Sequence, residues 1–202
     1  MTYKRKKQMI CITLAMIVAW MGTWGAVRAK ETRVQESLAK EVFRFHVIAN
    51  SDSEQDQKLK MKVKEKIIAY MEEKLPESDS VEMTKEWAVS NMAIIESIAE
   101  NTLREEGCFC EVRGTIENCY FPDKTYGDVT FPKGNYDALR IEIGAAEGKN
   151  WWCVLYPNLC FLDAVHAVVP EEGKDKLKNV LDKEEYEMVT ALSKFRIGWF
   201  FC

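Results

Sequence analysis

The sequence predicts an α+β fold: a membrane or signal helix, then one domain with a mainly antiparallel sheet packed by about three helices. Three observations predict it. Residues 8–27 carry no charge, two segments between residues 51 and 105 have apolar residues at helical spacing, and later segments alternate as strands do. A chain of 202 residues, 47% of them hydrophobic, can bury one core. We expect the order β-α-α-β-β-β-α in the domain.

The first element is the apolar run at residues 8–27, which follows the basic cluster at residues 4–7. Twenty helical residues span about 30 Å, enough to cross a bilayer. The basic cluster would stay in the cytoplasm, so the rest of the chain would be exported. Val27-Arg28-Ala29 resembles a cleavage site, but the run is longer than usual for a signal peptide. Residues 1–29 are therefore either a signal peptide or a membrane anchor.

The remaining chain is predicted as a polar tether at residues 30–40 and a single exported domain at residues 41–202. Residues 1–29 hold five basic residues and no acid, so without them the net charge falls from −4 to −9. A domain with so much negative charge is expected to bind nucleic acid poorly, because contacts to phosphate need clustered lysine and arginine.

The domain is expected to begin with a half-buried strand at residues 42–48, with Arg44 and His46 on its polar face. Ser51 and Glu54 have the spacing of a capping box, which predicts a helix that starts there and ends at Pro76. A second helix is expected at residues 84–105, capped by Gly107.

The second half of the domain is predicted to be richer in strands. Alternation predicts strands at residues 108–117, 138–143 and 151–156, the last two joined by a hairpin turn at 144–150. The Pro-, Gly- and Asp-rich residues 118–136 are expected to form a long structured loop. A last helix should start at Asp182 or Lys183 and end near Arg196.

Six cysteines lie outside the apolar run, an even number that permits three disulfides with fifteen pairings. Cys108 and Cys110 are alternatively small apolar residues on a buried strand face, and in a compartment of low oxidant all six would stay free thiols. Zinc is disfavoured because Cys108 and Cys110 are too close for the usual ligand spacing and no histidine is near. We expect no metal and no cofactor. The candidates for disulfides are Cys108, Cys110, Cys119, Cys153, Cys160 and Cys202.

Two clusters are candidates for contact with a partner. Residues 44–52 bring a strand end, a polar turn and a helix N-terminus together, which suits either a binding site or a simple capped turn. Trp151 and Trp152 would point to opposite faces of a strand, so one can face outward as a contact anchor. The predicted partner-binding residues are Arg44, His46, Asn50, Ser51, Asp52, Trp151 and Trp152.

An exported hydrolase is the alternative from another class. It would use Cys153 or Cys160 with His166, oriented by Asp163, and act on cell-wall or extracytoplasmic substrates. No G-x-S-x-G, HExxH or phosphate-loop motif accompanies these residues. We therefore predict a protein that is not an enzyme, with no catalytic residue and no small-molecule substrate.

Two long blocks resemble the stage II sporulation protein R family. They are RFHVIANSDS at residues 44–53, and YGDVTFPKGNYDALR at residues 126–140 with its continuation GKNWWCVLYP at 148–157 and Leu159-Cys160-Phe161. The resemblance implies a signalling protein of endospore formation, exported from the forespore into the space between the septal membranes. It also implies a partner, the membrane-embedded aspartic protease of the mother cell that cleaves the sigma-E precursor. Membrane contact is expected through residues 8–27.

Overall fold

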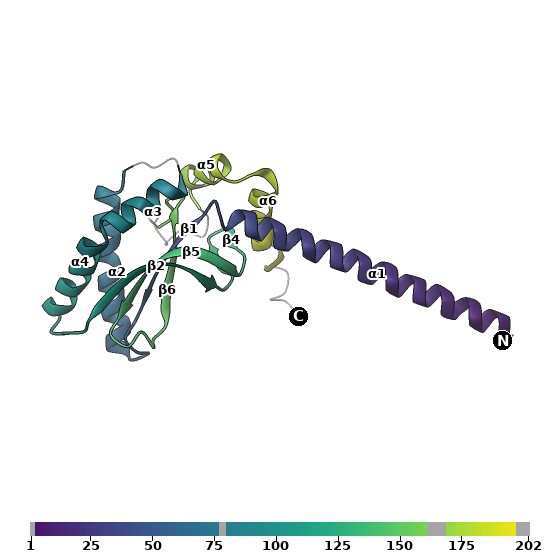
Figure 1. The fold of residues 1–202 in the computed structure, drawn as a ribbon, viewed down its shortest axis with the longest axis horizontal. Coiled ribbons are helices and arrows are strands. Elements are labelled where there is room, and N and C mark those ends of the chain that lie inside the picture. The colour runs from purple at the N-terminus through teal and green to yellow at the C-terminus, as the bar shows by residue number, and fades with distance from the viewer. Residues whose placement is uncertain (1–2, 77–79, 161–168, 197–202) are drawn as a thin grey trace.

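A long N-terminal helix projects from a domain built on a four-stranded sheet (Figure 1). The structure is a computed structural model that describes residues 3–76, 80–160 and 169–196, with side chains from residue 12 to residue 191 of these ranges. The predicted fold class is confirmed. The elements are α1 (Tyr3–Leu38), β1 (Phe43–Ile48), α2 (Glu54–Lys74), α3 (Val81–Ser90), α4 (Met92–Glu105), β2 (Val112–Phe121), β3 (Lys124–Tyr126), β4 (Val129–Phe131), β5 (Gly134–Ile143), β6 (Asn150–Tyr156), α5 (Glu171–Val180) and α6 (Lys183–Arg196).

The sheet has the strand order β2-β5-β1-β6 and is mainly antiparallel. Strand β1 pairs in parallel with β5, whereas the β2–β5 and β1–β6 pairs are antiparallel. The prediction of a hairpin turn at residues 144–150 is wrong, because β5 and β6 are not neighbours. Residues 144–149 instead cross the end of β1, which lies between these strands. The alternation of apolar and polar residues indicates that a segment is a strand, but it does not indicate which strand it pairs with.

Strand β1 is buried along its whole length, so the prediction of a half-buried strand is wrong. Its odd-numbered residues face a core formed with α2, α3 and α4. Arg44 and His46 face a second core formed with the β3–β4 hairpin, α5, α6 and the end of α1. Because helices and hairpin cover both faces, Arg44 and His46 lie inside the protein.

Two helix predictions need correction. Helix α2 begins at Glu54 with Ser53 as its N-cap, not Ser51, and the Ser53 hydroxyl accepts the Asp56 N–H. The predicted helix at residues 84–105 is two helices, α3 and α4, separated at Asn91. The Asn91 amide donates to the Trp87 carbonyl, the kind of side-chain bond that competes with a continuous helix.

Two predicted helix ends are confirmed. Gly107 has φ +75° and ends α4, with Gly107 N–H bonded to Arg104 and Cys108 N–H to Leu103. At the start of α6, Asp182 and Glu185 cap each other through reciprocal bonds of 2.8 and 2.9 Å. Helix α5 was not predicted.

The segment predicted as a long loop at residues 118–136 contains more regular structure than expected. Strand β2 extends to Phe121, strands β3 and β4 form a hairpin, and β5 already begins at Gly134. The hairpin brings aromatic side chains over the second face of the sheet.

Helix α1 is the one helix in the described residues that is long and apolar enough to cross a membrane, over Ile12–Leu38. Residues 30–38, expected as part of a polar tether, are its last turns. Val34 is 8% exposed and Leu38 is fully buried, so the helix ends inside the second core.

Candidate functional site

The seven predicted contact residues lie in three places rather than on one surface. Arg44, His46 and Trp152 face the second core, and Trp151 packs edge-on against Phe45 on the other face of the sheet. The three turn residues, Asn50, Ser51 and Asp52, lie where β1 and β5 end and β2 and β6 begin. We call this the distal end, formed by residues 49–56, 106–111 and 144–149, because α1 enters the domain at the opposite end of β1.

Arg44 is fully buried and forms no ion pair with an acid among the described residues. Its Nε donates to the Cys153 carbonyl and its Nη2 to the Tyr126 hydroxyl, both at 3.2 Å, whereas Nη1 has no hydrogen-bond partner there. Burial lowers the pKa of Arg44, with Tyr126 acting in the opposite direction. Aromatic rings replace a carboxylate around the guanidinium, with centroids 4.5–5.9 Å away at Phe121, Tyr136, Phe131 and Tyr126.

His46 lies beside Arg44, stacked on Trp152 at 5.0 Å with its Nε2 3.7 Å from the Cys119 sulfur. Burial, with the nearby Arg140 and Arg44 acting in the same direction, lowers the pKa of His46 to about 4. Burial also raises the pKa of the Cys119 thiol to about 11. Both groups are therefore neutral near pH 7, which is the reverse of an activated thiolate–imidazolium pair.

Acidification is expected to destabilise the fold through His46. Because its folded pKa of about 4 lies below the usual value of 6.5, the unfolded chain binds more protons between these values. The stabilisation is complete above pH 6.5 and is lost as the pH falls towards 4. From pH 7.5 to 5.5 the loss is roughly 1 to 1.5 kcal/mol. Denaturation across this range measures it, with His46→Gln as control; equal slopes for the two proteins would contradict the assignment.

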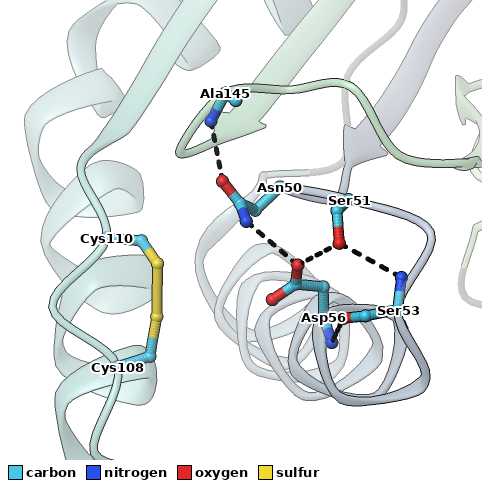
Figure 2. The surroundings of a disulfide bond; sticks show 7 residues. All are labelled: Asn50, Ser51, Ser53, Asp56, Cys108, Cys110 and Ala145. Atoms are coloured by element: carbon cyan, nitrogen blue, oxygen red, sulfur yellow. Dashed lines mark hydrogen bonds between the residues drawn. A yellow bond between two sulfur atoms is a disulfide. The ribbon is translucent and has the colours of Figure 1, made fainter.

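The distal turn is held by hydrogen bonds within the chain (Figure 2). Asp56 accepts from the Asn50 amide at 3.0 Å and from the Ser51 hydroxyl at 2.5 Å. The bonds from Ser51 and Asn50 lower the pKa of Asp56, with burial acting in the opposite direction. Asn50 also accepts the Ala145 N–H at 2.9 Å, which joins the turn to the loop at residues 144–149. Asn50 and Ser51 therefore use their polar groups to fix the backbone.

The same loop is tied to the turn from its other side. Asp52 accepts the Lys149 N–H at 2.7 Å, and Gly148 N–H donates to the Ala49 carbonyl at 2.9 Å. The buried Lys60 donates to the Lys149 carbonyl. The block at residues 44–53 and the block that begins at residue 148 are thus one structural unit at the distal end.

Four of the six candidate cysteines form two disulfides, Cys108–Cys110 and Cys153–Cys160. Cys108 and Cys110 precede β2, so their expected place on a buried strand face is wrong. Cys119 is free and half-buried, and Cys202 lies outside the described residues. Bonded to each other, Cys153 and Cys160 are not available as nucleophiles. His166 and Asp163 also lie outside the described residues. Within the residues that the structure describes, no cluster of side chains suited to hold a metal occurs.

The two disulfides are expected to contribute differently to stability. They join residues seven and two positions apart, and chain entropy then predicts losses of about 2.5 kcal/mol for Cys153→Ser with Cys160→Ser and about 1.5 kcal/mol for the shorter pair. Denaturant midpoints of the two double variants measure the difference. The opposite order would show that loop closure does not determine their contributions.

The four aromatic residues around Arg44 were not predicted from the sequence, because all of them lie at residues 121–136, within the segment that was expected to be a long loop. The signal was an arginine and a histidine within an otherwise apolar strand. Phe109 was also not predicted, although it lies between two cysteines and two residues after the capping glycine.

Comparison with known proteins accounts for both blocks. The profile of the family described as stage II sporulation protein R (spore_II_R) matches residues 39–166. Stage II sporulation protein R of Bacillus subtilis (strain 168) is 32% identical over 196 residues, covering 93% of this chain and 85% of the relative. No solved structure matches significantly. The chain therefore belongs to the stage II sporulation protein R family.

Proposed function

We propose that this sporulation protein is an exported signal that activates a membrane-embedded aspartic protease, which then cleaves the sigma-E precursor. Membership of the family carries the proposal. Helix α1, whose apolar run follows the basic cluster at residues 4–7, supports export from the forespore into the septal space, as either a cleaved signal or an anchor. The acidic body and the neutral His46–Cys119 pair support a protein that acts by binding rather than by catalysis.

Activation by binding requires that the signal bind the active form of the protease more tightly than the inactive form. Expression of this chain with the protease and the precursor in a non-sporulating host tests the proposal. Cleavage is expected with the full chain and not with a chain that lacks residues 1–29, because the latter stays in the cytoplasm. Equal cleavage with and without the chain would overturn the proposal.

One variant in the same cleavage assay distinguishes the binding signal from the hydrolase alternative. His166→Gln is expected to leave cleavage of the precursor unchanged, because a binding signal needs no catalytic imidazole. Loss of all activity by an exported, folded His166→Gln protein would instead favour the hydrolase.

A further inference from the structure

Phe109 is the most exposed large hydrophobic side chain among the described residues, at 85%. Among the side chains that the structure describes outside α1, the next most exposed large apolar ones are Val89 at 62% and Tyr120 at 59%. An aromatic ring left in water gains free energy when a partner covers it, and aromatic residues are enriched among the anchors of protein interfaces.

The backbone presents Phe109 in a fixed position. The disulfide between its two neighbours, Cys108 and Cys110, closes a three-residue loop, and both half-buried cysteines pack against the first core. Before this loop, Gly107 and Cys108 are bonded to the last turn of α4. A backbone fixed in this way has less conformational entropy to lose on binding.

Phe109 lies at the distal end, away from the membrane helix. Strand β1 leads from the end of α1 to the distal turn, and its six residues span about 20 Å. Figure 1 shows α1 leaving one side of the domain and the end of α4, which leads to Phe109, on the other. With α1 in or near one membrane, Phe109 faces away from that membrane.

The charges around Phe109 indicate the chemistry of its partner. Glu111 and Glu147 are exposed at the distal end, and Glu105 is exposed next to it, at the end of α4. None of these three forms an ion pair with a described residue, whereas Glu106 pairs with Lys62. An acidic surface is repelled by anionic lipid headgroups, which disfavours insertion of Phe109 into a bilayer. The same surface complements a basic protein surface.

We propose that Phe109, fixed by the Cys108–Cys110 disulfide, anchors the chain in an apolar pocket with a lysine or arginine rim on the exported part of the protein it activates. This inference rests on the proposed function, and it adds the docking surface. The distal end then reaches across the septal space, while α1 marks the membrane from which the chain was exported.

The cleavage assay above tests the anchor with a matched pair of variants. Phe109→Ala is expected to lower cleavage at limiting amounts of the signal about 30-fold, as for an aromatic interface anchor. Tyr120→Ala removes another exposed aromatic ring, at the opposite end of β2, and should leave cleavage unchanged. If the unaltered chain stimulates cleavage but Phe109→Ala does so equally well, the docking surface is wrong. If the unaltered chain has no effect, the proposed function itself fails.

Photo-crosslinking identifies what covers the ring. The full chain with p-benzoylphenylalanine at position 109 is expected to crosslink to the protease, and the same group at position 120 is not. A product only with lipid or only with a second copy of this chain would overturn the proposal, as would no product at position 109. Equal denaturant midpoints for Phe109→Ala and the unaltered chain confirm that the variant is folded.

Discussion

Arg44→Ala is expected to lower the free energy of unfolding by about 3 to 5 kcal/mol, the range for truncation of a large, fully buried side chain. The variant leaves a cavity between the sheet and the β3–β4 hairpin and removes the bonds to Cys153 and Tyr126. It also removes the cation from the surrounding aromatic rings. Chemical denaturation of the full chain in detergent measures the loss.

Arg44→Met separates volume from charge at the same position. Methionine fills most of the space, and a buried ionic group can often be replaced by an apolar one at small cost, so the loss should stay within about 1.5 kcal/mol. If Arg44→Met were as unstable as Arg44→Ala, the hydrogen bonds and the cation–π contacts would dominate over packing. Because Arg44 has no exposed surface, a folded but inactive Arg44→Met protein would mean that the interior, not a direct contact, transmits the effect.

The sequence predicted the elements of this fold better than their arrangement. Local spacing identified β1, α2 and β5, because each carries its own apolar pattern. The two-sided burial of β1 could not be predicted, since it depends on a hairpin some 80 residues away whose Tyr126 meets Arg44. The crossing of β1 by residues 144–149 is likewise a long-range property that alternation does not encode.

For the candidate site, the sequence identified individual residues but not the surface on which they lie. Asn50, Ser51 and Asp52 were singled out, and the structure engages their side chains in bonds to Asp56, Ala145 and Lys149. Ala145 and Lys149 lie more than 90 residues further along the chain, so the contacts with them give no local signal. Their role in partner binding remains a prediction. Because they fix the backbone of the distal end, they could also act indirectly, by helping to hold Phe109 in place.

Gly148→Ala is expected to be among the most damaging single changes, with a loss of about 3 kcal/mol, the upper part of the usual range for overpacking. A Cβ at this position would lie 2.3 Å from the Ser51 carbonyl oxygen and 2.6 Å from its carbon. Both are backbone atoms, so the loop must move and the Gly148–Ala49 hydrogen bond is lost. Denaturation of the full chain measures the effect; a loss below about 1 kcal/mol would show that the two segments are not closely joined.

Ala146→Gly provides the matched control on the same loop. Ala146 has φ +54°, a conformation that costs an alanine about 1 kcal/mol and a glycine almost nothing. Its change should therefore leave stability equal or raise it by up to about 1 kcal/mol. Opposite signs at two positions two residues apart would exclude a general intolerance of this loop to substitution. The close approach of residue 148 to the Ser51 backbone would then be the feature that holds the distal end together.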